Sequence, residues 1–115
     1  MTHLWLHGLL ELCLLGLLGE RRDYGLGLTN RLSEAGLGFV PGGTIYPALA
    51  RLEATGMVSS AREPSTSGPP RKYFELTKAG RHALDGRRTE WREFSRSIHT
   101  VLGTKELACG TKEVA

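Results

Sequence analysis

The sequence is short of the residues that mark secreted, metal-binding and catalytic proteins. Its 115 residues include only two cysteines, Cys13 and Cys109, which excludes a disulfide framework and a cysteine-based metal cluster. The four histidines have no spacing typical of metal ligands, and no Ser-His-Asp or Cys-His set can be assembled. We therefore expect no enzymatic activity, no cofactor and no metal site.

Long hydrophobic runs are also missing. The apolar run from Leu12 to Leu18 follows Glu11 and is far shorter than the roughly 20 residues that a membrane span needs. No basic segment precedes the run and no convincing cleavage site follows it, so a secretory signal is not expected. The sequence predicts a cytoplasmic protein with no membrane association.

Neither sign of charge is in large excess, and the net charge is +3. Ten of the 15 Lys and Arg residues lie between Arg51 and Arg96. Such a basic half is compatible with a nucleic-acid partner but does not require one. With 40% hydrophobic and 23% charged residues, the chain has the composition of one soluble globular domain with a modest core.

Residues 43–58, GTIYPALARLEATGMV, predict a helix that runs directly into a strand. Proline is harmless only in the first turn of a helix, so Pro47 indicates the start and Thr44 is the expected N-cap. Gly56 is expected to end the helix. Helical spacing predicts an inward face made of Ile45, Leu49 and Leu52. The outward face would carry Tyr46, Pro47, Ala50, Arg51 and Ala54. The small outward residues suit close approach to a polyanionic groove, although a solvated surface helix has the same pattern.

Two more helices are expected before this segment. Leu4–Leu18 is leucine-rich on more than one face, which in a small protein indicates contact with a partner chain. The next helix is expected from about Tyr24 to Ala35, with Asp23 as its cap and Gly36 at its end. Its inward residues would be Leu28, Leu32 and Ala35. Glycines 25 and 27 leave room either for close packing or for approach of a backbone to phosphate.

A hairpin is predicted after the central helix. Met57 to Arg62 can form one strand, residues 63–70 (EPSTSGPP) can only be a loop, and Arg71 to Leu76 forms the returning strand. Phe74 and Leu76 would alternate with Tyr73 and Glu75 along this strand. The basic pair at the start of the returning strand, Arg71 and Lys72, suits contacts to phosphate oxygens, although charge is also the ordinary protection of an edge strand.

The last predicted helix begins after Thr77, which is a good N-cap. Its apolar residues recur at three- and four-residue steps and are Leu84, Trp91, Phe94, Ile98, Val101 and Leu102. A single small domain has little core left to cover this stripe. We therefore infer dimerisation through the last helix together with the first.

Three segments together resemble the PadR family of bacterial winged helix-turn-helix transcriptional regulators, in its short form. They are Tyr24-Gly25, residues 43–58, and GPPRKYFELTKAGRHAL at 68–84. The resemblance implies an α+β, mainly α, fold with three N-terminal helices, a β-hairpin wing and a long C-terminal helix. It divides the chain into a DNA-binding domain (1–76), a dimerisation helix (77–103) and a flexible tail (104–115).

Members of that family bind palindromic operators in double-stranded DNA as homodimers, mostly as repressors, and many release the DNA when a signal reaches them. The resemblance assigns DNA contacts here to Tyr24, Thr44, Tyr46, Pro47, Arg51 and, in the wing, Arg71 and Lys72. Arg51 is the expected base contact because a guanidinium can meet guanine O6 and N7 together. The dimer interface is expected to include Leu9, Leu12, Leu84, Trp91, Phe94, Ile98 and Val101.

Two features leave alternatives open. Trp5 and Trp91 could line a pocket between protomers for a flat aromatic effector, or they could be packing anchors, which is the more common role. Ala50 and the lightly charged wing differ from the usual pattern of the family. A winged-helix protein-interaction module that has lost operator binding is therefore the alternative to a DNA-binding repressor.

Overall fold

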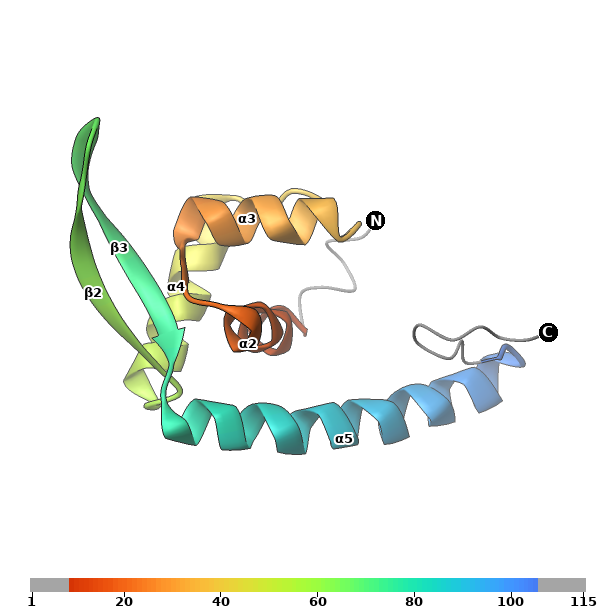
Figure 1. The fold of residues 1–115 in the computed structure, drawn as a ribbon. Helices are drawn as coiled ribbons and strands as arrows, with labels where there is room; N and C mark the ends of the chain where they lie inside the picture. The colour runs from red at the N-terminus through yellow and green to blue at the C-terminus, as the bar shows by residue number, and fades with distance from the viewer. Residues whose placement is uncertain (1–8, 106–115) are drawn as a thin grey trace. The chain divides into compact units, whose positions relative to one another are not determined.

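A computed structural model describes residues 9–105 of the chain (Figure 1). In chain order its elements are α2 (Leu10–Glu20), β1 (Asp23–Tyr24), α3 (Gly25–Glu34), α4 (Gly42–Ala54), β2 (Val58–Ser65), β3 (Gly68–Leu76) and α5 (Lys78–Leu102). The chain forms two compact units, Met1–Leu84 and Asp85–Ala115, so the division falls within α5. Among residues 9–105, no helix combines the length and the apolar character that crossing a membrane requires.

The core of the first unit is formed by α2, α3, α4 and one face of the sheet. Eight large side chains in it are less than 2% exposed, and they are Leu14, Leu15, Leu18, Leu28, Leu32, Ile45, Leu49 and Leu52. Leu84 of α5 belongs to the same cluster and is 4% exposed. Its expected place in a dimer stripe is therefore wrong, because the core of its own domain already buries it.

Helix α2 buries much of its leucine content within its own unit. Of the predicted Leu4–Leu18 helix, residues 4–8 lie outside the part that the structure describes, and the described helix ends at Glu20. The Arg31 guanidinium of α3 donates to the Leu17 carbonyl at 2.9 Å and pairs with Glu20 at 2.8 Å. These contacts bind the carboxyl end of α2, where the Leu17 carbonyl also accepts the Arg21 backbone N–H at 3.4 Å.

Asp23 has a different role from the predicted helix cap. It lies in β1 opposite Phe74, and Tyr24 occupies the N-cap position of α3. The Asp23 carboxylate accepts the Tyr24 backbone N–H at 2.8 Å and pairs with Arg31 at 3.0 Å. Strand pairing with a residue far along the chain therefore overrode the local capping signal.

Helix α3 buries Leu28 and Leu32 as predicted, but Ala35 is exposed. That part of the prediction was wrong because the helix ends at Glu34 and Ala35 is its C-cap. Gly36 ends the helix with φ +92°, and its N–H donates to the Ser33 carbonyl at 2.9 Å. A positive φ is the conformation that favours glycine after a helix.

Helix α4 begins earlier than predicted, because its N-cap lies three residues before Thr44. The N–H groups of Thr44 and Ile45 already donate to the Pro41 carbonyl at 2.9 and 3.0 Å, so Pro41 is the N-cap and Thr44 is not. Pro47 consequently lies inside the helix rather than at its start. The end is as predicted, because Gly56 has φ +81° and its N–H bonds to the Glu53 carbonyl at 3.0 Å.

The two faces of α4 agree with the predicted helical spacing. The inward residues Ile45, Leu49 and Leu52 are at most 1% exposed, and Ala48 joins them at 0%. All five residues predicted to face outward are exposed, and they are Tyr46, Pro47, Ala50, Arg51 and Ala54.

The hairpin is longer than predicted, and the sheet has the strand order β1-β3-β2. Residues 63–70 are not a loop, since β2 continues to Ser65 and β3 begins at Gly68. The register shifts between Glu63 and Ser65, so Pro64 occupies an irregular position. Strand β1 pairs only with Tyr73 and Phe74, so residues 68–72 have one open edge. An open edge tolerates proline because it needs no ladder N–H there.

Helix α5 begins as predicted. The Thr77 hydroxyl accepts the Gly80 N–H at 3.0 Å, which is the bond of an N-cap. Three helices followed by a hairpin wing make the first unit a winged helix-turn-helix, and the mainly helical α+β class is confirmed. Figure 1 shows the hairpin projecting beyond the helices of the first unit.

Candidate nucleic-acid interface

The exposed face of α4 is small and uncharged along its first two turns. Thr44, Tyr46, Pro47 and Ala50 are all exposed, and no charged residue lies between Gly42 and Ala50. Small side chains allow another surface to approach the helix closely. Entry of this face into a groove remains the prediction made from the sequence.

Tyr46 is 51% exposed, and its ring lies against the start of α3. A Cβ atom at Gly25 would overlap the phenol ring, and one at Gly42 would contact it at 3.4 Å. A Cβ at Gly27 would similarly overlap the Asp23 carboxylate. Both α3 glycines thus make room for side chains of the protein itself. Of the two roles considered for Gly25 and Gly27, close packing and approach of a backbone to phosphate, the contacts favour close packing.

Arg51 has an ion-pair partner that the sequence did not indicate. Its Nε lies 2.6 Å from Oε2 of Glu11 in α2, while the side chain remains 61% exposed. The bond uses Nε, so the two Nη groups take no part in the pair with Glu11. Those are the groups with which a guanidinium reaches guanine O6 and N7.

The two basic residues of the wing face opposite sides of the sheet, as neighbours in a strand must. Nζ of Lys72 lies 3.8 Å from Glu53 of α4, on the side of the core. The Arg71 guanidinium lies 4.6 Å from the centroid of the Tyr24 ring, on the outer side. The structure therefore separates the pair and joins Arg71 to Tyr24 instead.

The outer side of the sheet carries four stacked side chains, Arg22, Tyr73, Tyr24 and Arg71, which we call the wing ladder. Arg22 lies 4.7 Å from the centroid of the Tyr73 ring. The rings of Tyr73 and Tyr24 are 5.3 Å apart and tilted by 52°. Arg71 then covers the Tyr24 ring. Cations over aromatic faces are attracted by the ring quadrupole, so the ladder orders both guanidinium groups.

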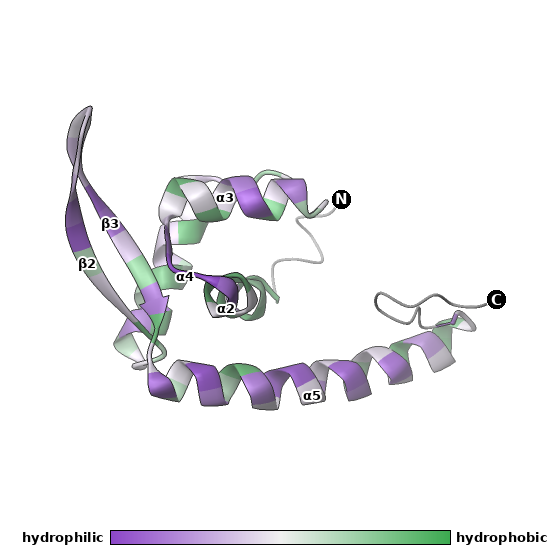
Figure 2. Cartoon of the chain, in the orientation of Figure 1, coloured by the Kyte–Doolittle hydropathy of each residue, from purple (hydrophilic) through white to green (hydrophobic). Residues whose placement is uncertain are grey.

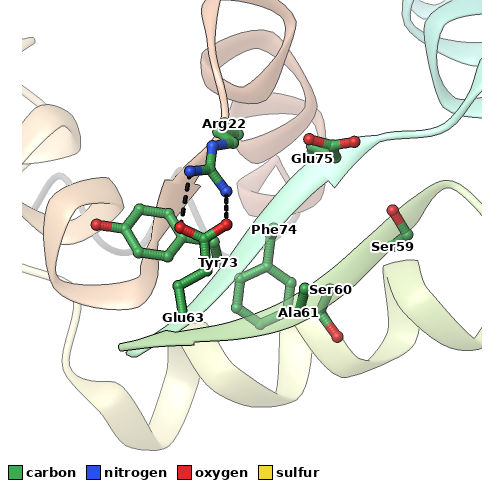
Figure 3. A pocket seen from close by; sticks show the side chains of 8 residues that line it. All are labelled: Arg22, Ser59, Ser60, Ala61, Glu63, Tyr73, Phe74 and Glu75. Atoms are coloured by element: carbon green, nitrogen blue, oxygen red, sulfur yellow. Dashed lines mark hydrogen bonds and ion pairs between the residues drawn. The ribbon is translucent and has the colours of Figure 1, made fainter. Parts of the chain in front are cut away.

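Glu63 of β2 closes one end of this ladder (Figure 3). Its two carboxylate oxygens accept bonds from the two Nη groups of Arg22, one at 2.8 Å. The hydrogen bonds lower the pKa of the Glu63 carboxyl below its usual range and raise the pKa of the Arg22 guanidinium. An open pocket of about 250 Å³ lies beside the pair.

The site residues predicted from the sequence do not include Arg22, Tyr73 or Glu63. They meet because β1 pairs with β3, and that pairing joins residues about 50 positions apart. No local sequence pattern predicts a strand of only two residues. The predicted alternation already placed Tyr73 on the side of the strand opposite to Phe74, which the structure shows to be buried.

In the second unit, α5 carries an exposed apolar stripe. Its members are Trp91, Phe94, Ile98, Val101 and Leu102, which are between 40% and 82% exposed. The rings of Trp91 and Phe94 are 6.3 Å apart. Figure 2 shows hydrophobic segments recurring along α5 between hydrophilic ones. Leu9 and Leu12, the other expected interface residues, are half-buried, and Trp5 and Cys109 lie outside the described residues.

Comparison with known proteins agrees with this fold. The model of the transcriptional regulator PadR-like family matches residues 14–86. Transcriptional regulator Rv3488 of Mycobacterium tuberculosis is 37% identical over 79 residues, which are 69% of this chain and 72% of that protein.

Two solved structures are similar over most of the chain. A PadR-like transcriptional regulator from Bacillus cereus is 31% identical with a TM-score of 0.76, over 87% of this chain and 97% of that one. A PadR family transcriptional regulator from Eggerthella lenta is 29% identical with a TM-score of 0.75, over 86% of each chain.

Proposed function

Because the chain belongs to the PadR-like family of transcriptional regulators, we propose that it is a repressor that binds a palindromic operator as a homodimer and is released by a signal. Membership itself makes it a DNA-binding transcriptional regulator. Its relatives are regulators and not enzymes, which confirms the expectation that it has no enzymatic activity. The repressor role, the operator symmetry, the dimer and the signal are the proposed part.

The exposed face of α4 supports the proposed contact with the major groove. Thr44, Tyr46 and Pro47 lie on the part of this face that carries no charge of its own. In this proposal Thr44 contacts a phosphate, and Tyr46 and Pro47 contact base edges. Arg51 contacts guanine through its Nη groups while Glu11 holds its Nε.

The wing and the start of α3 would contact the DNA backbone next to that groove. Tyr24, Arg71 and Lys72 are the residues for this role, and Arg71 carries its charge on the outer side of the sheet. Contacts to phosphate orient a protein on the duplex without reading its sequence. The wing thus supplies affinity, and α4 supplies specificity.

The apolar stripe of α5 supports a homodimer. Burial of exposed apolar side chains such as Phe94, at 58% exposure, against a second copy of the same helix would stabilise a dimer. A dimer with twofold symmetry presents its two recognition helices about one DNA turn apart, roughly 34 Å, or a multiple of it. A palindromic operator matches that symmetry.

The release signal is proposed to act at the dimer helices. Trp91 is 41% exposed, so a flat aromatic effector could stack on its ring. Packing inside the dimer is the other use of the same side chain. The protein would act in the cytoplasm, where the DNA of a bacterium lies.

Salt dependence of DNA binding tests the proposed function. We expect the purified protein to bind the intergenic duplex beside its own gene. A plot of log K against log salt should fall with a slope of about −0.9 for each phosphate contact. Fluorescence anisotropy of a labelled duplex measures this slope. A flat response would contradict the proposal and favour the protein-interaction module.

Replacing Arg51 with alanine is expected to weaken operator binding about tenfold, because one bidentate base contact contributes roughly 1–3 kcal/mol of discrimination. Glu11→Gln is the matched control, since it weakens the same ion pair but keeps the guanidinium. Affinity should fall in Arg51→Ala and not in Glu11→Gln. Equal losses in the two variants would show that the Arg51–Glu11 pair only supports the fold.

A further inference from the structure

Glu63 and Arg71 are direct partners across the β2–β3 hairpin. Their Cα atoms are paired in the antiparallel register, so both side chains leave the same side of the sheet. Opposite charges at such a position normally attract each other. The simplest expectation is therefore an ion pair between Glu63 and Arg71 across the hairpin.

The structure shows a different pairing. The Glu63 carboxylate turns to Arg22, which lies just before β1, and receives hydrogen bonds from both of its Nη groups (Figure 3). Among the ion pairs of residues 9–105, none involves Arg71. Binding at both oxygens fixes the orientation of the Glu63 carboxylate toward Arg22.

Arg71 is held by aromatic contact instead. Its guanidinium lies over the Tyr24 ring, and Tyr24 in turn packs against Tyr73 and Arg22. Stacking on a ring face leaves the N–H groups at the edge of the guanidinium free to donate. The wing ladder therefore orders a cation without neutralising its charge.

We propose that Arg22 is a positioning residue for the wing, which holds Glu63 away from Arg71 and so keeps Arg71 available for a DNA phosphate. The proposal rests on the proposed function, because it takes the wing as a contact to the DNA backbone. Without Arg22, Glu63 would turn to its cross-strand partner. Arg71 would then have to leave an ion pair before it could bind phosphate.

Removal of Arg22 tests this role when it is combined with removal of Glu63. Arg22→Ala should weaken binding to the labelled intergenic duplex and reduce the salt slope by about 1 for each wing. Arg22→Ala with Glu63→Gln should restore both. Arg22→Ala with Glu75→Gln is the matched control, because it removes the same charge from a glutamate that pairs in register with Ser59 instead of Arg71.

The outcomes separate this role from a direct DNA contact by Arg22. Rescue by Glu63→Gln and no rescue by Glu75→Gln would support the positioning role. Equal weakness in both double variants would overturn it, since Arg22 would then contact DNA itself. Arg22→Ala on an Arg71→Ala background should change nothing further, and an additional loss there would also overturn it.

Two measurements guard against other causes. Arg22→Lys keeps a cation beside Glu63 and should retain most of the wild-type slope, and circular dichroism should show that all variants are folded. If the wild-type protein shows no salt-dependent binding, the proposed function fails, and this inference fails with it. If the wild-type protein and Arg71→Ala differ in slope but Arg22→Ala matches the wild type, only the positioning role fails.

Discussion

Replacing Ile98 with aspartate is expected to leave the protein monomeric. Ile98 lies in the middle of the exposed stripe of α5, between Phe94 and Leu102, and is 40% exposed. A carboxylate buried in an apolar interface without a partner would raise the dissociation constant by about 100-fold or more. Light scattering after size exclusion at micromolar concentration measures the change in mass. Operator affinity should fall in parallel, because a monomer occupies only one half-site.

Thr100→Asp is the matched control for this experiment. Thr100 is exposed and lies two residues further along α5, on the opposite side of the helix by the 100° step per residue. Both variants introduce one negative charge near the carboxyl end of the helix. The control should remain dimeric. A monomeric wild-type protein, or equal masses for Ile98→Asp and the wild type, would contradict the proposed dimer.

Replacing Gly80 with alanine is expected to reduce the free energy of unfolding by about 2 kcal/mol. A Cβ atom at Gly80 would overlap the backbone carbonyl oxygen of Met57 and approach Leu76 at 3.3 Å. Overpacking of this kind costs about 3 kcal/mol when the neighbour is backbone, and the better helix propensity of alanine offsets about 1 kcal/mol of it. Urea denaturation at one fixed protein concentration measures the difference.

Gly86→Ala is the control with the opposite sign. Gly86 lies in the interior of the same helix, and a Cβ atom there meets nothing within 4 Å. Its replacement should stabilise the protein by up to about 1 kcal/mol through helix propensity alone. A Gly80→Ala variant as stable as Gly86→Ala would show that the contact between α5 and Met57 relaxes at no cost.

The contact at Gly80 also explains why the predicted cap of α5 lacks an acidic side chain three residues after Thr77. The Thr77 hydroxyl donates to the Gly56 carbonyl at 2.6 Å, and the Thr77 N–H donates to the Met57 carbonyl at 3.0 Å. The first turn of α5 is therefore pressed against the end of α4. Only glycine fits at the point of closest approach, so tertiary packing selected it over the capping residue.

Patterns of short range were predictable from the sequence by itself. The inward and outward faces of α4, the glycines that end α3 and α4, and the Thr77 cap all follow from spacings of three or four residues. The family and the winged fold followed from ordered motifs of the same local kind. Physical rules for helices act between near neighbours, so a sequence displays them directly.

Contacts between distant segments were decided only by the tertiary structure. Strand β1 exists because β3 passes beside it, and that pairing turned Asp23 from a cap into a strand residue. The wing reaches Ser65 and Gly68 because its prolines lie at an irregular position and along an open edge. The ion pairs Glu11–Arg51 and Arg22–Glu63 each join residues about 40 positions apart in the chain. Electrostatic partners are chosen by distance in space, which the order of residues does not contain.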